Sequence, residues 1–265
     1  MARIVTNSSA NTVYKNYSQS SSKLASSAEK LATGLRINRA SDDAAGLAIS
    51  EGMRAQVRGS DVAVDNIANA VNFLNTADGY LQTVSDILGR MEELAVSYGD
   101  GTKSTTDQGN IDAEWATLST QLEDLAFNNI PQFNGTDLFS VATISIQTGA
   151  NSADTITLSA TDLHTAVTAV SHSATTQTVQ DVQDSIALVS TLRATMGADQ
   201  ARLQFQSSAL QNYSENISAA ESRIRNVDMA KETTNFSRYQ IQVQAGTAML
   251  AQANQLPQNV LSLLR

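Results

Sequence analysis

The residues that could perform chemistry are few in this chain and lack the spacing that chemistry needs. His164 and His172, the two histidines, lie in a Ser/Thr-rich segment with no carboxylate at metal-ligand spacing, and there is no cysteine. No HExxH, P-loop, GxGxxG or GxSxG motif occurs, so neither a zinc peptidase, a nucleotide site nor a serine nucleophile is indicated. The sequence therefore predicts a protein that is not an enzyme and that holds no metal or cofactor.

Two adjacent carboxylates, Asp42 and Asp43, could in principle form an acid pair or bind a cation. A simpler interpretation is that they cap a helix, because a short side-chain oxygen accepts hydrogen bonds from the free backbone N–H groups of a first turn. Their charge would then be balanced by Arg36, Arg39 or Arg54. We expect a structural role for both carboxylates.

Charge is unevenly distributed along the chain. The net charge is −9, and between Lys103 and Arg193 there are ten Asp or Glu residues with no Lys or Arg. An acidic centre repels phosphate backbones, and neither end carries a basic cluster. Nucleic acid is therefore not an expected partner.

We expect neither a membrane span nor a cleaved secretory signal in this sequence. No apolar run reaches the roughly 18 to 20 residues that a transmembrane helix needs. The segment MARIVTNSSANTVYKNYS has no apolar core of the kind that a cleaved signal peptide contains. A protein of this kind that leaves the cell would use a route that does not recognise such a signal.

Long helices with heptad-like apolar spacing are predicted along most of the chain. They cover residues 4–35, about 44–98, about 111–125 and about 182–265. The turn sequence GDGT at 99–102 separates the second from the third. In the first helix the expected seam residues, at spacings of four and three, are Ala10, Tyr14, Tyr17, Ser21, Leu24, Ala28, Leu31 and Leu35.

A small β-hairpin is predicted at about 143–158, where ATISIQTG and DTITLSA alternate in polarity around GANSAD. The Ser/Thr-rich segment at about 159–180 is expected to be a surface loop. The predicted fold is mainly α: a long antiparallel helical coiled-coil or bundle rod with a small β-hairpin, in which the N- and C-terminal helices pair.

The C-terminal segment MLAQANQLPQNVLSLLR is apolar at helical spacing and almost uncharged. From Thr233 onward only Arg238 and Arg265 are charged, and the polar positions are mainly Gln and Asn. Such a face suits burial against protein, and it suits a lipid surface poorly because basic residues are missing. The segment could dock within its own subunit or complete its core with neighbouring copies. We expect a kink or a local break at Pro257.

Four long motifs in this order resemble those of bacterial flagellins. They are GLRINRASDDAAGLAIS at 34–50, LGRMEELAVSYGDGT at 88–102, ESRIRNVDMAKE at 221–232 and GTAMLAQANQLPQNVLSLLR at 246–265. A hook-filament junction protein has related ends, but DDAAGLAIS and LAQANQLPQNVLSLLR fit flagellin better. The chain is too short for the large variable outer domains that many flagellins carry.

The resemblance implies an inner domain made of residues 1–44 and 225–265 and an outer helical rod made of residues 45–224. The inner domain would line the core of a filament built from many copies of the chain. The residues that the resemblance assigns to self-assembly are Tyr17, Leu24, Leu31, Leu35, Met249, Leu250, Leu256, Val260, Leu263 and Leu264.

The resemblance also implies an extracellular location and a set of partners. The chain would pass unfolded through the flagellar export apparatus, with an export chaperone on its C-terminal segment. In the flagellum it would meet the hook-associated junction and cap proteins. The alternative is a secreted helical hook-filament junction protein or binding module that forms no filament of its own.

Flagellins of this type can be detected by Toll-like receptor 5. The family's recognition residues correspond here to Arg90, Leu94 and Glu114. Gly89 and Glu92 stand where the active pattern usually has a glutamine and an arginine. Because Glu92 reverses a charge close to Arg90, we expect weakened recognition.

Overall fold

The chain forms two compact units. The terminal unit contains residues 1–55 and 216–265, and the central unit contains residues 56–215. The computed structural model describes residues 7–128, 130–139, 143–159, 162–168, 170 and 178–263, and it describes the backbone alone for residues 128 and 256–263. Helices α2 (Ala44–Tyr98) and α5 (Val179–Arg225) contribute to both units.

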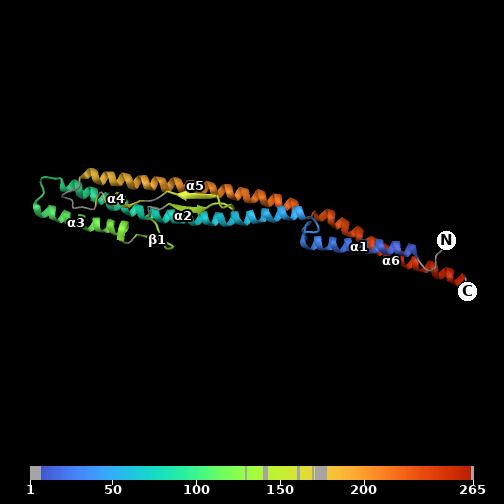
Figure 1. Cartoon of the computed structure of the whole chain (residues 1–265). Helices are drawn as coiled ribbons and strands as arrows, with labels where there is room; N and C mark the ends of the chain where they lie inside the picture. The colour runs from blue at the N-terminus through green and yellow to red at the C-terminus, as the bar shows by residue number, and fades with distance from the viewer. Residues whose placement is uncertain are drawn as a thin grey trace. The chain divides into compact units, whose positions relative to one another are not determined.

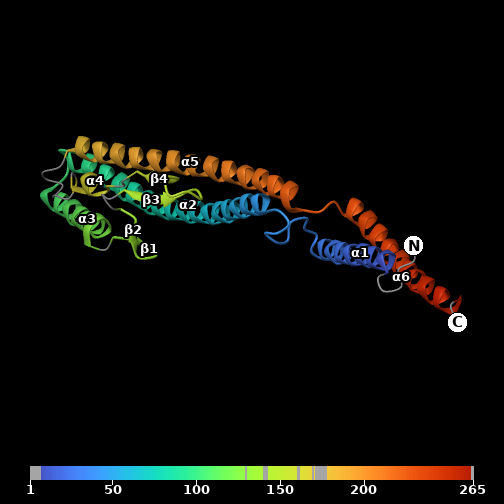
Figure 2. The same ribbon diagram turned by 45° about the vertical axis from the view of Figure 1, so that its right-hand side comes forward.

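The terminal unit is built around an antiparallel pair, α1 (Ser8–Thr33) and α6 (Met229–Leu263), which lie side by side in Figures 1 and 2. Helix α1 begins where the Asn7 side chain accepts a hydrogen bond from the Ala10 N–H, at 3.0 Å. It ends at Gly34, whose φ of 71° is a left-handed conformation that glycine adopts without strain. The predicted pairing of the terminal helices is confirmed.

The two helix breaks of the terminal unit are hydrogen-bonded to each other. Leu35 and Asn226 form an isolated antiparallel bridge, with the Arg36 N–H donating to the Arg225 carbonyl at 2.6 Å. The Val227 N–H donates to the Gly34 carbonyl at 2.9 Å. The connection from α1 to α2 therefore holds the connection from α5 to α6 in place.

The carboxylates of this loop have the expected capping roles. Asp43 Oδ1 accepts from the Gly46 N–H at 2.9 Å in the first turn of α2. Asp42 Oδ2 accepts from the N–H groups of Asn38 and Arg39 at 3.1 and 3.0 Å. These backbone donors, with Arg39 first, lower the pKa of Asp42 because they stabilise the ionised carboxylate.

The expected arginine partners of these carboxylates are directed elsewhere. Arg39 pairs with Glu29 and Arg54 pairs with Glu51. Because backbone donors already occupy Asp42 and Asp43, neither carboxylate needs a cation as its main partner.

The central unit consists of α2 and α5, which run antiparallel, with shorter elements packed beside them (Figure 1). The register of the long helices is fixed by Arg193 of α5, whose Nε donates to Asp78 Oδ1 of α2 at 2.8 Å. The shorter helices are α3 (Thr105–Glu123), the π-helix η1 (Asp124–Asn128) and α4 (His164–Thr168). Helix α3 starts at a capping box of Ser104 and Asp107.

Two antiparallel hairpins complete the central unit. Strand β1 (Gln132–Phe133) pairs with β2 (Thr136–Asp137) across Asn134 and Gly135, both at positive φ, as a tight two-residue turn requires. Strand β3 (Ile144–Gln147) pairs with β4 (Thr155–Leu158), with Ile146 opposite Ile156. The hairpin predicted at 143–158 is therefore confirmed.

The core of the central unit is closed. Leu81 and Val84 of α2, Trp115 of α3 and Val189 and Leu203 of α5 are all 0% exposed. These residues come from helices far apart in the sequence, and their burial explains why the apolar stripes predicted on these helices face one another.

Part of the Ser/Thr-rich segment contradicts the expected surface loop. Leu163, Ala166, Val167 and Val170 are at most 2% exposed and join the core, and α4 carries two of them. Polar residues dominate the composition here, but these four apolar side chains decide the packing. Residues 160, 161, 169 and 171–177 lie outside the described part of the chain.

The seam predicted on α1 is right at most positions and wrong at two. Tyr14 is 63% exposed and Ala28 is exposed, whereas the half-buried Val13 and Ser20 and the buried Ser27 belong to the seam. The predicted residues that are half-buried are Ala10, Tyr17, Ser21, Leu24, Leu31 and Leu35. Val13 and Tyr14 are adjacent apolar residues, so either could begin the repeat. The two serines decide the register because both donate hydrogen bonds to residues of α6.

Candidate functional site

The surface between α1 and α6, the terminal seam, is incompletely buried. Ser27 at 2% and Ala253 at 7% exposure are the only fully buried residues among the described side chains of these two helices. The remaining seam residues are half-buried: Val13, Tyr17, Ser20, Leu24 and Leu31 of α1, and Glu232, Phe236, Tyr239, Val243, Gly246 and Leu250 of α6. Because apolar stabilisation scales with the area removed from water, this pair gains much less per residue than the central core.

Polar contacts fix the register of the terminal seam. Ser27 Oγ donates to Glu232 Oε1 at 2.5 Å, and Asn235 Nδ2 of the same helix holds the other oxygen of that carboxylate at 3.3 Å. Ser20 Oγ donates to Gln242 Oε1 at 3.4 Å. A sliding movement of one helix along the other would break the two serine bonds, so the seam has one preferred alignment.

Gly246 allows the two helices to approach each other closely. A Cβ at this position would lie 3.1 Å from Cδ2 and 3.4 Å from Cβ of Tyr17. The Tyr17 ring therefore packs directly against the backbone of α6, which a larger residue at position 246 would prevent.

Asn7 joins the two ends of the described chain. Its side-chain oxygen caps α1, and its Nδ2 donates to the Ala253 carbonyl of α6 at 2.8 Å. Pro257 stands four residues after Ala253 and has no N–H to donate to that carbonyl. The Asn7 amide supplies the missing donor.

We expected a kink or a local break at Pro257, and the break is wrong because α6 continues as helix to Leu263. The compensating donor is 250 residues away in sequence, at Asn7, and no local pattern could have pointed to it. The match between the Asn7 amide and the carbonyl that Pro257 leaves without a donor becomes visible only once α1 and α6 are placed side by side.

The residues assigned to self-assembly divide into several environments. Tyr17, Leu24, Leu31 and Leu250 lie half-buried on the terminal seam, and Leu35 is half-buried in the bridge with Asn226. Met249 is 55% exposed and faces away from the seam. The backbone of α6 includes Leu256, Val260 and Leu263, but their side chains, and Leu264 altogether, lie outside the described part.

Large apolar side chains remain exposed on this helix pair. Tyr14 is 63%, Ile241 65% and Met249 55% exposed. From residue 233 to residue 255 the only charged residue is Arg238. The outer face therefore combines apolar side chains with amides and lacks the charges that normally solvate an exposed helix.

An ion pair secures the helix breaks beside this surface. Arg225 Nη1 lies 2.7 Å from Glu51 Oε1, and Arg36 Nη2 donates to the Ile224 carbonyl at 2.6 Å. The hydrogen bond from Arg225 is the main cause that lowers the pKa of Glu51. The junction is thus rigidly hydrogen-bonded although it contains no regular secondary structure.

The three residues that the resemblance assigns to receptor contact differ in their exposure to solvent. Arg90 and Glu114 form an ion pair at 2.7 Å and both side chains are about half exposed, whereas Leu94 is 5% exposed within the core. Hydrogen bonds from Arg90 to Glu114 and to Glu93 raise the pKa of the arginine. Glu92 accepts from Gln183 Nε2 of α5 at 2.8 Å, so its carboxylate is held against α5.

The described residues bring together no group of metal ligands around the one described histidine, His164. His164 packs edge-to-face on Phe127 at 4.1 Å between ring centroids, and His172 lies outside the described part of the chain. Across the described ranges, no three His, Asp or Glu side chains gather in a way that could hold a metal ion. No helix in those ranges has the length and apolarity to cross a bilayer.

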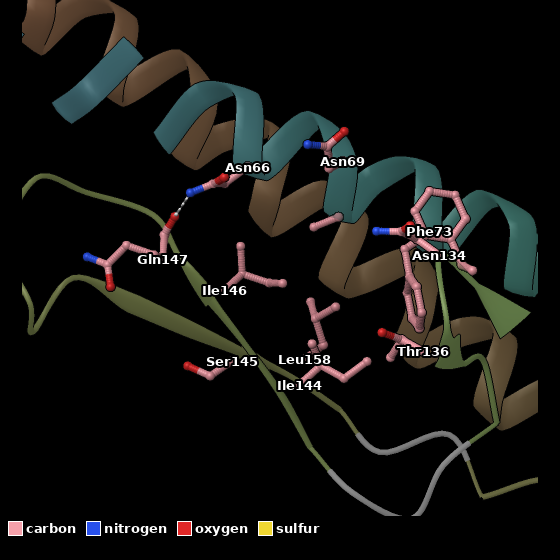
Figure 3. A pocket seen from close by; sticks show the side chains of 12 residues that line it. Asn66, Asn69, Phe73, Asn134, Thr136, Ile144, Ser145, Ile146, Gln147 and Leu158 are labelled. Atoms are coloured by element: carbon pink, nitrogen blue, oxygen red, sulfur yellow. Dashed lines mark hydrogen bonds between the residues drawn. The ribbon is translucent and has the colours of Figure 1, made fainter. Parts of the chain in front are cut away.

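A groove of about 320 Å³ lies between α2 and the two hairpins (Figure 3). Phe73 meets Phe133 edge-to-face at 5.9 Å, and Ile144, Ile146 and Leu158 make the groove largely apolar. Asn66 Nδ2 donates to the Gln147 carbonyl at 3.3 Å, which attaches the β3–β4 hairpin to α2. No charged side chain lines this groove. We therefore interpret it as the surface on which the hairpins pack against α2.

The double role of Asn7 leads to a testable prediction. Asn7→Asp keeps the capping oxygen but removes the donor, so the Ala253 carbonyl loses its partner; we expect a loss of about 1–3 kcal/mol per subunit. In a Pro257→Ala background the loss should fall below half, because the alanine N–H can bond the same carbonyl. Both effects are measured by heating the filament that the sequence predicts and recording its loss of helix by circular dichroism.

Asn11→Asp is the matched control, since Asn11 is exposed and its side chain has no partner among the described residues. Equal losses from Asn7→Asp in the two backgrounds would contradict the compensation.

The ends of the chain also match known protein families. Residues 4–143 match the profile of the bacterial flagellin N-terminal helical region, and residues 179–264 match that of the C-terminal helical region. A flagellin of Halalkalibacterium halodurans is 46% identical over 247 residues, which cover 89% of this chain and 90% of that protein.

Two further relatives extend the comparison. A flagellar filament 33 kDa core protein of Treponema phagedenis is 39% identical, with coverage of 89% and 91%. A flagellin of Bacillus subtilis is also 39% identical, with coverage of 89% and 91%. The similarity thus covers both helical ends and most of the length of this chain and of its relatives. The chain belongs to the bacterial flagellin family.

Proposed function

We propose that this chain is the structural subunit of a flagellar filament, which grows by polymerisation of many copies. The observation that carries this proposal is the terminal seam, which is half-buried in one copy and bears exposed Tyr14, Ile241 and Met249 outside it. The family match supports it, and the Treponema phagedenis relative is named as a filament core protein. Contacts between unlike surfaces that do not close into a ring generate such an open polymer.

Within the filament we assign residues 1–44 and 225–265 to the inner core and residues 45–224 to the outer rod. The helix breaks at residues 34–43 and 226–228 fall close to these bounds and support the assignment. Neighbouring copies would cover the outer face of α6, which from residue 233 to residue 255 carries Arg238 as its one charge and where amides can pair with other amides. The filament would transmit rotation as an extracellular propeller.

The second candidate is a secreted junction protein or binding module with no filament of its own. It is favoured only by the polar contacts between α1 and α6 that already fix the terminal seam in one copy. The two functions differ in a simple observable, since only a filament subunit elongates on preformed seeds.

Deletion of residues 249–265 tests the proposal. The deletion removes Ala253 and Leu250 from the terminal seam and should abolish seeded growth, whereas the full-length chain should grow. Trp115, the single tryptophan, is 0% exposed in the central core, so its fluorescence reports whether the rest of the chain is folded. Growth is measured by light scattering and electron microscopy.

The expected result is unchanged Trp115 emission without growth. Wild-type elongation of the deleted chain would overturn the role of the terminal helices. Loss of the native emission would also count against it, because the segment would then be needed for folding rather than for assembly.

We further propose export without cleavage of an N-terminal signal, with an export chaperone masking the C-terminal segment. The uncharged amphipathic stretch from residue 233 onward supports this idea, because it would aggregate if left free in the cell. The hook-associated junction and cap proteins would be the partners at the filament ends.

The proposed export without cleavage predicts the mass of the subunit. Subunits from sheared filaments should have the mass of the full chain, 28.2 kDa. A product shortened by 15 to 30 residues would argue for a cleaved signal instead.

We propose weak recognition by Toll-like receptor 5 through Arg90 and Glu114. Their partial exposure supports contact, and Leu94 would act by holding α2 in position. Glu92 places a negative charge beside Arg90 and should reduce affinity. In a reporter assay with monomer, Glu92→Arg should raise the signal, whereas Glu215→Arg, an exposed reversal on α5, should not. Equal responses of both variants and the wild type would exclude this explanation.

A further inference from the structure

The two units differ strongly in charge. Residues 56–215 contain 5 Lys or Arg and 19 Asp or Glu, a net charge of −14, so the remaining residues carry +5. Two central units brought together would repel each other unless the contact contains cations.

Two of the five cations of the central unit are already paired. Arg90 pairs with Glu93 and Glu114, and Arg193 pairs with Asp78. Lys103 is half-buried in the turn that precedes α3. Arg58 and Arg202 are exposed and form no ion pair or hydrogen bond with any described residue. These two arginines are therefore available to a partner.

Arg202 lines a groove to which Arg58 does not contribute. The groove, of about 580 Å³, runs between one face of α5, which carries Arg202, Gln206 and Tyr213, and the turn that joins β3 to β4. Ser60 of α2 also lines it; its side chain is 1% exposed and its Oγ has no hydrogen-bond partner within the described structure. A polar group without a partner at the base of a groove is a position where an occupant or its bound water would gain a hydrogen bond.

An exposed aromatic side chain adjoins the groove. Phe205 is 78% exposed and follows Arg202 by three residues on α5, a spacing that places two side chains on neighbouring positions of a helix surface. Aromatic and arginine side chains are the commonest energetic centres of protein interfaces. Arg202 and Phe205 together thus have the composition of a contact point for protein.

Most carboxylates that could meet Arg202 lie on the central unit of another copy. Of the seven acidic residues of the terminal unit, six already have partners: Glu29 and Glu51 are paired with arginines, Asp42, Asp43 and Asp228 accept from backbone N–H groups, and Glu232 accepts from Ser27. The central unit holds 19 of the 26 acidic residues and has few cations to pair with them.

We propose that the groove around Arg202 receives a carboxylate-bearing surface of the central unit of a second copy of this chain. This inference rests on the proposed filament function and specifies one of its contacts. Arg202 neutralises the local repulsion between two acidic units, and Phe205 buries apolar area beside the ion pair. A charged hydrogen bond that is shielded from water is stronger than an exposed one, so the groove adds more than a surface arginine would.

Charge reversal separates this contact from a general effect of net charge. Arg202→Glu and Arg58→Glu change the net charge equally, and both positions are exposed. We expect Arg202→Glu to raise the critical concentration for seeded growth by at least about tenfold and Arg58→Glu to leave it within about twofold. Native Trp115 emission verifies that each variant is folded. Equal effects of the two variants, or no effect of Arg202→Glu, would overturn the inference.

Cross-linking identifies the partner carboxylate. Arg202→Lys keeps the positive charge and introduces an amine that a water-soluble carbodiimide can couple directly to an Asp or Glu. In filaments, mass spectrometry of a mixture of isotope-labelled and unlabelled subunits should find position 202 joined to an acidic residue of the central unit of another copy. In monomer this product should be absent. Coupling within one chain only, or no coupling at position 202 in filaments, would refute the contact.

These results remain distinct from a failure of the proposed function. A wild-type chain that does not elongate on seeds refutes the filament subunit itself. Wild-type elongation together with unimpaired Arg202→Glu refutes only the groove contact.

Discussion

The incomplete burial of the terminal seam is the constraint on which the assembly of this protein depends. The central unit closes its own core around Leu81, Val84 and Trp115, whereas the described part of the α1–α6 pair fully buries only Ser27 and Ala253. A two-helix pair of this kind gains too little apolar burial to offset the entropy of ordering some sixty residues. Its stability must come from further copies, and this requirement couples the folding of the terminal unit to polymerisation.

Polar contacts give this under-buried pair its specificity. Ser27 with Glu232, Tyr17 against Gly246, and the Asn7 amide on the Ala253 carbonyl each define the same alignment of α1 with α6. None of them contributes much area, but each is lost if the helices slip. A newly added copy can therefore dock on an α1–α6 pair of the filament in which these contacts already define how the two helices are aligned.

The sequence predicted the helices, the hairpin and the pairing of the termini because apolar periodicity and turn residues are local signals. It failed where a distant residue decided the outcome. Pro257 stays helical because Asn7 supplies a donor, and the exposed Tyr14 is replaced on the seam by Val13, Ser20 and Ser27, because the two serines find acceptors on α6. At positions 90, 94 and 114, residue types alone could not reveal that Leu94 is buried whereas Arg90 and Glu114 form a half-exposed pair.

Amide hydrogen exchange along α6, compared between monomer and filament, tests the central claim most directly. In monomer, amides of residues 233–255 should exchange at least about a hundredfold faster than those around Leu203 of α5, because the terminal seam opens easily without neighbours. In filaments the two sets should be similarly protected. Protection of α6 in monomer equal to that of α5 would contradict the claim, since the helix pair would then be stable in a single copy.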